Sequence, residues 1–120
     1  MASELRSLLA PNFVREDHRA LVGMPTVDGD GWIEQLLTFF DLGFGSPTFR
    51  LSEVVAVRGE RLALYWIEIT FGDGIVDRRL GIAQYDASVE LVERYVSFDD
   101  QDVDQAIVAL DEMSARLAEA

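Results

Sequence analysis

The sequence predicts an α+β fold in which helices pack against a curved, antiparallel β-sheet. The second half of the chain contains four consecutive runs rich in β-branched, aromatic and other apolar residues, separated by short breaks. Apolar residues at helical spacing precede and follow these runs. Short breaks favour hairpins between neighbouring strands, and the flanking helices would then cover the sheet.

Composition limits the classes of function that this chain can perform. The 120 residues include no cysteine and carry a formal net charge of −12. We therefore expect one domain over residues 1–120 that folds without disulfides in a reducing, cytoplasmic setting. The negative charge repels phosphate groups, so we expect no nucleic-acid partner. We also expect no membrane partner, because no apolar run approaches the roughly 20 residues that span a bilayer, and the first ten residues lack signal-peptide features.

The chain is expected to begin with a short helix and a strand. Residues 3–9 place three leucines on one side of a possible helix, which Pro11 would stop. Residues 12–21 form the predicted strand, which starts apolar and ends in ionisable side chains. This strand is the most chemically loaded segment of the protein.

A turn-rich segment and a second helix follow. Residues 23–31 contain a proline and an alternation of aspartate and glycine, which favour turns. Apolar residues then recur at helical spacing from Trp32 onward. We expect Asp30 to cap this helix and Gly43 to end it, before a glycine-containing loop leads into the sheet.

The four expected strands are joined by three breaks. The break at residues 72–74 places two glycines around an aspartate, which supplies the positive φ values of a tight turn. The breaks at residues 58–60 and 86–88 are short and polar. Adjacent strands should therefore pair antiparallel. They are residues 49–57, 62–71, 76–85 and 89–98.

The last element is predicted to be a helix that packs along the sheet. Asp99 or Asp100 is expected to cap its free amides, where a negative charge also suits the helix dipole. An apolar stripe at helical spacing would face the sheet. It consists of Val103, Ile107, Leu110, Met113 and Leu117.

Motifs for metals and phosphates are better explained by helix caps and turns. Asp100, Asp102 and Asp104 imitate the start of a calcium loop, but Gln105 stands where that loop needs glycine. One histidine and no cysteine leave few ligands for a transition metal. The glycines at residues 43–45 follow a helix and precede a strand, which is the reverse of a phosphate-binding loop. We therefore expect no metal and no cofactor.

The chemistry-bearing candidates lie at the end of the first strand, in Glu16, Asp17, His18 and Arg19. A carboxylate there that faced an apolar cavity would have a raised pKa and could move protons near neutral pH. Alternatively, polar residues at a strand end form solvated ion pairs. For Asp17 the residues alone favour neither interpretation.

Large aromatic residues are the candidates for the wall of a ligand pocket. They have a simpler alternative role, because large aromatic side chains more often fill the core or an interface. The sequence favours that role and leaves the pocket wall as the alternative. The candidates are Trp32, Trp66, Tyr85 and Tyr95.

The order of elements and the residues Phe13-Val14-Arg15-Glu16-Asp17-His18 resemble the nuclear transport factor 2-like superfamily. Ketosteroid isomerases, SnoaL-like polyketide cyclases and many noncatalytic domains share this cystatin-like, cone-shaped fold. Residues 92–100 look like the closing segment of SnoaL-like domains. The superfamily usually opens with a long lid helix, whereas residues 3–9 resemble only the shorter helix that follows it, so the N-terminal helical part is shortened.

The resemblance implies a role for Asp17 but also shows two departures. In the isomerases a strand ending in Val-Glu-Asp-Pro carries the proton-shuttling aspartate, which corresponds here to Asp17 as a general base. His18 stands in place of the proline. The aspartate that holds the oxyanion would fall near Gly81, which has no side chain.

The resemblance further implies that Glu93, Tyr95 and Ser97 face the cavity from the last strand. Together with His18 and the aromatic candidates, Glu93 and Tyr95 are therefore the expected ligand-binding residues. Both phases of residues 62–71 and 89–98 are apolar, which predicts a homodimer through the outer face of the sheet.

Two functions from different classes fit this sequence. The first is a SnoaL-like module that binds a small, largely apolar ligand or serves in sensing or assembly without catalysis. The second is an isomerase, cyclase or hydrolase that uses Asp17 as general acid or base. A second polar group that converges on Asp17 across the cavity would favour the enzyme.

Overall fold

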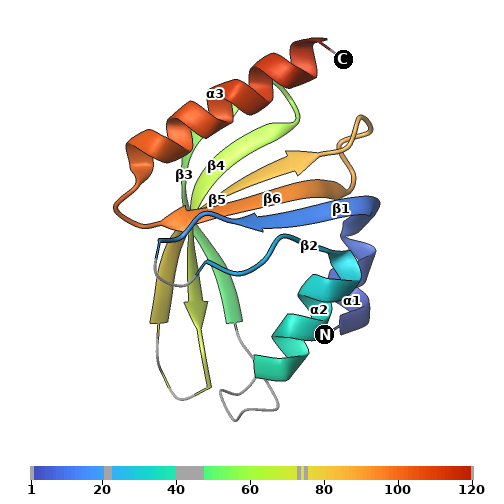
Figure 1. The fold of residues 1–120 in the computed structure, drawn as a ribbon, viewed down its shortest axis with the longest axis vertical. Coiled ribbons are helices and arrows are strands. Elements are labelled where there is room, and N and C mark those ends of the chain that lie inside the picture. Colours follow the sequence, from blue (N-terminus) through green and yellow to red (C-terminus); the bar gives the residue numbers. More distant parts are fainter. Residues whose placement is uncertain (1, 21–22, 40–47, 73, 75, 120) are drawn as a thin grey trace.

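The computed structural model describes residues 2–20, 23–39, 48–72, 74 and 76–119, and it confirms the α+β fold. In this part of the chain, three helices accompany one six-stranded sheet (Figure 1). The elements in chain order are α1 (Ala2–Ser7), β1 (Leu9–Asp17), β2 (Val27–Asp28), α2 (Gly29–Phe39), β3 (Thr48–Arg58), β4 (Leu62–Thr70), β5 (Val76–Tyr85), β6 (Val92–Asp99) and α3 (Val103–Glu119).

The sheet has the strand order β2-β1-β6-β5-β4-β3. Strands β3 to β6 form the predicted antiparallel meander. The sheet as a whole is mixed rather than antiparallel, because β1 runs parallel to its neighbour β6. This parallel pairing is possible because α2 and four strands lie between β1 and β6 in the sequence, which is far longer than a hairpin connection.

Strand β1 begins three residues earlier than predicted, and Pro11 lies inside it instead of stopping a helix. The start of β1 is held by β6, since the Val92 amide donates to the Leu8 carbonyl at 2.9 Å and Leu9 aligns with Val92. The register shifts between Leu9 and Val14, which accommodates a proline that cannot donate to the ladder. Pairing with β6 therefore overrides the helix-stop signal.

Helix α2 begins at Gly29, and its cap is Asp28 rather than the predicted Asp30. The Asp28 carboxylate accepts a 2.8 Å hydrogen bond from the Gly31 amide, as an N-cap does. Asp30 instead pairs with Arg6 of α1. The predicted end of this helix at Gly43 lies outside the described residues.

The turns of the meander confirm two predictions and correct a third. Gly59 and Gly74 have φ values of 61° and 88°, the left-handed region that tight turns require. The break after β5 is longer than predicted, because the Asp86 carboxylate accepts amide hydrogens from Glu90 and Leu91. As a result, Val89 lies in the turn with a φ of 59°, and β6 begins at Val92.

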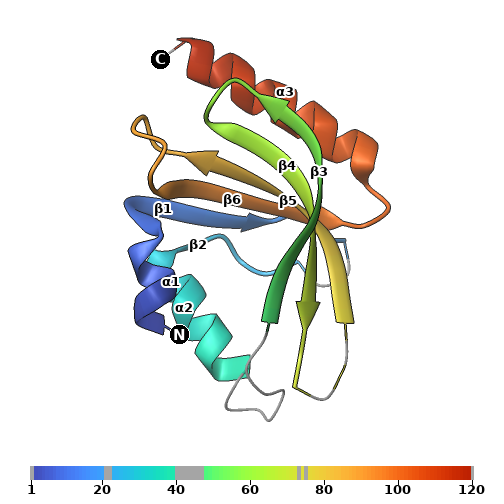
Figure 2. The same ribbon diagram turned by 180° about the vertical axis from the view of Figure 1, so that it is seen from behind.

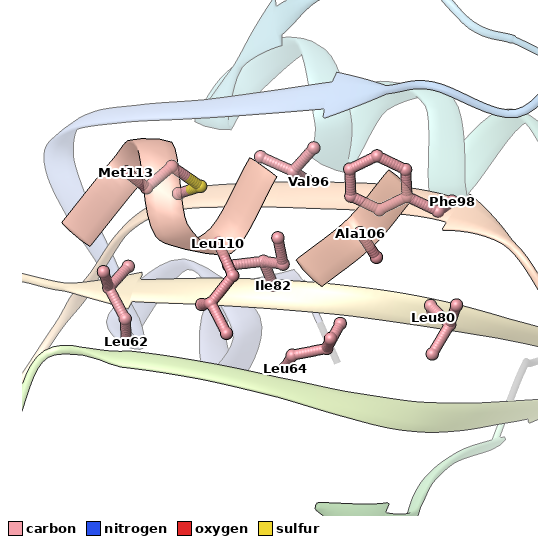
Figure 3. Close-up of a cluster of buried hydrophobic side chains, with 9 residues drawn as sticks. All are labelled: Leu62, Leu64, Leu80, Ile82, Val96, Phe98, Ala106, Leu110 and Met113. Atoms are coloured by element: carbon pink, nitrogen blue, oxygen red, sulfur yellow. The ribbon is translucent and has the colours of Figure 1, made fainter. Parts of the chain in front are cut away.

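Helix α3 lies across one face of the sheet and buries the main core there (Figure 3). Its Leu110 is fully buried, which confirms the predicted stripe. The helix begins at Val103, later than the predicted caps, and Asp99 accepts the Ala20 amide instead. The buried cluster consists of Leu62, Leu64, Leu80, Ile82, Val96, Phe98, Ala106, Leu110 and Met113.

Helices α1 and α2 lie on the opposite side of β1 and β6 from α3 (Figures 1 and 2). We call the two faces of the sheet the α3 face and the α2 face. Because both faces are covered within one chain, apolar residues at both phases of β4 and β6 do not by themselves require a partner. The homodimer stays a prediction, and exposed apolar side chains remain along β3, namely Phe49, Leu51, Val54 and Val57.

None of the helices in the described residues is long and apolar enough to cross a membrane.

The α3 face should dominate the stability of the domain. We expect Leu110→Ala to lower the free energy of unfolding by about 2–5 kcal/mol, because it leaves a cavity at a fully buried position. Val108→Ala, on the exposed side of the same helix, is the matched control and should stay within about 0.5 kcal/mol of wild type. Urea denaturation measures both, and equal effects would contradict this assignment of the core.

Candidate functional site

Asp17 is the last residue of β1 and lies on the α2 face of the sheet. Its partner in register on β6 is Ser97, which pairs in turn with Gly81 of β5, so the three residues form one row across the sheet. The Asp17 side chain is fully buried, with 0% of its surface exposed. A carboxylate at such a position needs partners, because an unpaired buried charge is strongly destabilising.

Within the described residues, five hydrogen bonds converge on the Asp17 carboxylate. The Arg19 guanidinium donates two of them, from Nε at 2.9 Å and from Nη2 at 2.7 Å. The backbone amides of Arg19 and Met24 each donate at 3.1 Å, and the Ser97 hydroxyl donates at 3.1 Å. This set of donors fills the lone pairs of both carboxylate oxygens.

The donors keep Asp17 ionised. Burial alone favours the neutral acid, but the hydrogen bonds from the Arg19 side chain and from the Arg19 and Met24 amides lower the pKa of Asp17 to about 2. Burial also acts to lower the pKa of Arg19, but the pairing with Asp17 outweighs it and raises that pKa. This direction for Asp17 is opposite to the shift expected of a carboxylate in an apolar cavity.

The Asp17–Arg19 pair belongs to a larger charged group on the α2 face. Arg19 also reaches Asp77 of β5 at 3.4 Å, and Asp77 pairs with Arg79 two residues further along. Arg15, on β1, is 95% buried and donates to the Gln35 side chain of α2 at 2.7 Å. We call these five residues, Arg15, Asp17, Arg19, Asp77 and Arg79, the arginine cluster.

Aromatic side chains adjoin the arginine cluster. Trp32 of α2 stacks on Phe13 of β1 and on Tyr95 of β6, whose ring centroids lie 5.3 and 5.7 Å from that of Trp32. Tyr95 also lies over Gly81, because a Cβ atom added there would come within 2.9 Å of the Tyr95 hydroxyl. The absence of a side chain at Gly81 thus provides room for Tyr95.

Two of the predicted ligand-binding residues lie on the α3 face, away from Asp17. His18 packs on Phe98 with ring centroids 5.1 Å apart, and its ring contacts Glu16 at 3.3 Å. Trp66 packs against the α3 core and carries the Arg78 guanidinium 4.3 Å above its ring. His18 directly follows Asp17, and neighbouring residues in a strand point to opposite faces of the sheet. His18 therefore lies on the α3 face while Asp17 lies on the α2 face.

Two more predicted residues lie at the other end of the sheet from Asp17. Glu93, near the start of β6, forms an ion pair with Arg61 at 2.5 Å and accepts from Gln84 at 2.7 Å. The Tyr85 carbonyl accepts from the same arginine at 2.9 Å. Of the expected site residues, the structure therefore brings together Asp17, Trp32 and Tyr95.

The sequence interpretation missed Arg15 and Arg79 as members of the site. Arg15 precedes Asp17 by two positions, so strand alternation placed both on one face. Arg79 required the register of β5 against β6, in which it lies opposite Asp99, and this register follows from the position of the turn. The sequence alone could therefore have indicated Arg15 but not Arg79.

A separate depression of about 280 Å³ lies between α1, β1 and α2. Arg6 and Asp30 line it together with Leu9, Pro11 and other residues, and the arginine cluster does not. Because both members of the Arg6–Asp30 pair are more than half exposed, they are well solvated. This depression has the character of a polar surface groove.

Comparison with known proteins establishes the fold. No protein-family model and no curated protein sequence matches the chain. AusH from Aspergillus nidulans superposes on it with a TM-score of 0.65 and 18% identity, over 81% of this chain and 70% of AusH. The BvnE pinacolase from Penicillium brevicompactum gives a TM-score of 0.64 and 12% identity, over 96% of this chain and 85% of that protein.

A protein of the SnoaL-like family from Agrobacterium tumefaciens superposes with a TM-score of 0.62 and 13% identity, over 82% of this chain and 80% of that one. The chain has the nuclear transport factor 2-like fold. At these identities the similarity concerns the arrangement of the backbone, so the chemistry of this nuclear transport factor 2-like site has to be argued from its own residues.

The Asp17 ion pair should stabilise this fold. The folded-state pKa of about 2 lies below the ordinary value of 3.8, so the stabilisation is present above pH 3.8 and is lost as the pH falls toward 2. We expect Asp17→Asn to lower the free energy of unfolding at neutral pH by about 2–4 kcal/mol, since it leaves Arg19 without its main partner.

Urea denaturation at several pH values measures this effect. The difference between wild type and Asp17→Asn should shrink as the pH is lowered from 4 toward 2, because wild-type Asp17 then also becomes neutral. Asp104→Asn, at an exposed position of α3, is the control and should show no such loss at neutral pH. A constant difference at all pH values would show that the ion pair is not its source.

Proposed function

We propose that this chain is a noncatalytic, SnoaL-like module that binds a small, largely apolar molecule on the α2 face. The observation that carries this proposal is the full set of donors on Asp17, which leaves its carboxylate ionised and without a free lone pair. A general base works best with a pKa near the operating pH, and the pKa of Asp17 is about 2.

The aromatic stack supports a binding role. Trp32 and Tyr95 are both partly exposed, so their rings offer apolar contact area to a ligand while Phe13 holds Trp32 from behind. Aromatic rings of this kind contribute contact area at a low cost in conformational entropy. A flat apolar molecule beside Trp32 and Tyr95 would therefore be well accommodated.

Among the described residues, Asp77 is a second carboxylate near Asp17, and it is already paired with Arg19 and Arg79. The single histidine of the sequence, His18, lies on the α3 face. Burial raises the pKa of Tyr95 to about 12, so its hydroxyl remains protonated at neutral pH. The arginines are permanent cations. An acid–base mechanism would thus depend on Asp17 and Asp77, and both carboxylates are paired with arginines.

The alternative function is an isomerase, cyclase or hydrolase that uses Asp17 as general acid or base. The similarity to BvnE, which is named a pinacolase, and to IdmH from Streptomyces antibioticus, a candidate polyketide cyclase, supports this alternative. It requires Arg19 to move away from Asp17 when substrate binds, because the two hydrogen bonds from Arg19 occupy both carboxylate oxygens.

Ligand binding can be followed through the two tryptophans, which lie on opposite faces of the sheet. In Trp66→Phe the remaining Trp32 reports on the α2 face, and in Trp32→Phe the remaining Trp66 reports on the α3 face. We expect a flat polycyclic ketone at micromolar concentrations to quench the fluorescence of Trp66→Phe but not of Trp32→Phe. Quenching of Trp32→Phe alone would place the ligand on the wrong face.

Catalysis is tested separately with a β,γ-unsaturated ketone whose conjugated product absorbs in the ultraviolet. We expect wild type and Asp17→Asn both to give the rate of the buffer alone. The missing oxyanion side chain at Gly81 reinforces this expectation, because one preorganised donor is typically worth about 10²- to 10³-fold in rate. Turnover by wild type that disappears in Asp17→Asn, with circular dichroism showing that the variant is folded, would establish the alternative function.

A further inference from the structure

The arginine cluster has more cationic than anionic side chains in a strongly acidic protein. Its three guanidinium groups face two carboxylates, a net charge of +1, while the whole chain carries −12. Asp99 lies opposite Arg79 in register, but its carboxylate accepts the Ala20 amide, and among the ion pairs of the described residues none joins it to Arg79. Burial lowers the pKa of Arg15, and Asp17, Arg19, Arg79 and Tyr95 also act on it. Arg15 lies beside Tyr95 in register, so it belongs to the same part of the α2 face. Burying an excess cation costs free energy unless an anion neutralises it.

Two of the arginines have a buried donor without an acceptor. The Nε–H of Arg15 and the Nε–H of Arg79 are both inaccessible to water and make no hydrogen bond in the structure. Other nitrogen atoms of the two side chains do have acceptors. Arg15 Nη2 donates to the Gln35 side chain and to the Pro25 carbonyl, and Arg79 Nη2 donates to the Asp77 carboxylate. Unpaired buried donors are uncommon in folded proteins and require an explanation, such as a missing ligand.

The Tyr95 hydroxyl adds a third donor at the same place. No hydrogen bond joins it to another described residue, and it lies over Gly81 in the row that contains Ser97 and Asp17. The charges that act on it are those of Arg79, Arg19, Asp17 and Arg15. Because burial keeps this hydroxyl protonated, it can donate to an anion at neutral pH.

We propose that the ligand of this module carries a carboxylate, which binds to the Nε–H groups of Arg15 and Arg79 and to the Tyr95 hydroxyl while its apolar skeleton stacks beside Trp32. This inference rests on the proposed binding function and gives it a chemical class. A carboxylate neutralises the excess charge and supplies acceptors for all three donors, and hydrogen bonds between ionised groups are stronger than neutral ones. An apolar ketone or ester would satisfy the donors but leave the charge uncompensated.

The edge of the cluster is accessible from solvent. The side chains of Arg79 and Asp77 are 13% and 32% exposed, whereas Arg19 and Asp17 are 9% and 0% exposed. A ligand would therefore approach past Arg79 and Tyr95, and the Arg79 side chain would have to turn to expose the Nε–H groups of Arg15 and Arg79, which neighbouring atoms now cover. Asp17 stays paired with Arg19, so the ligand binds to Arg15 and Arg79, whose Nε–H groups have no acceptor.

The test compares an acid with its own ester. Isothermal titration calorimetry of the wild-type protein with 2-naphthoate and with methyl 2-naphthoate separates the contribution of the carboxylate from that of the same apolar ring. We expect the acid to bind at least tenfold more tightly than the ester. Equal affinities would overturn the carboxylate inference and leave the binding function in place, whereas no heat from either probe would overturn both.

Variants then locate the carboxylate. Arg15→Met and Arg79→Met keep much of the side-chain volume and should each reduce the preference for the acid at least fivefold, and Tyr95→Phe should reduce it about threefold. Arg78→Met, next to Arg79 in the chain but on the α3 face, is the matched control and should retain the preference. A preference that persists in both Arg15→Met and Arg79→Met, with circular dichroism showing folded protein, would contradict the proposed site.

Discussion

The ion pair between Asp17 and Arg19 is the interaction on which the candidate site depends. It lies where β1 ends, and it ties the Arg19 and Met24 amides back to the sheet through one carboxylate. The Ser97 hydroxyl of β6 donates to the same carboxylate. Asp17 therefore stabilises both the parallel pairing of β1 with β6 and the segment that follows β1. A carboxylate used in this way is structural, because each donor that fixes it also lowers its pKa and its capacity to accept a proton.

The two faces of the sheet differ in what they contribute to folding and to the proposed binding. The α3 face is apolar and closely covered, with Leu64, Leu80, Ile82 and Leu110 fully buried. The α2 face instead buries charged and aromatic side chains beneath a shorter helix, at a higher cost in desolvation. Stability can therefore come from one face while the other retains unpaired donors, which is a common arrangement at binding sites.

The sequence was sufficient to predict the meander, the two main helices and the fold class, because apolar periodicity and glycine turns are local signals. The helix cap was placed two residues too late, at Asp30, although the contact between Asp28 and Gly31 is local. The sequence was not sufficient for the parallel partner of β1, which depends on contacts between distant segments. The same limit applied to the site. Asp17 and Tyr95 were identified through resemblance, but His18 and Trp66 were assigned to the cavity before the face of each strand was known, and Arg79 was missed.

The central claim is that Asp17 is a donor-saturated structural carboxylate on a face that binds ligands. Its pKa can be measured directly by nuclear magnetic resonance, following the side-chain carboxyl carbon of Asp17 during a pH titration, with Asp17→Asn used to assign the signal. The structure predicts a midpoint at about 2. A midpoint at or above the ordinary value of an aspartate, about 4, would contradict the account and return Asp17 to the role of a general base.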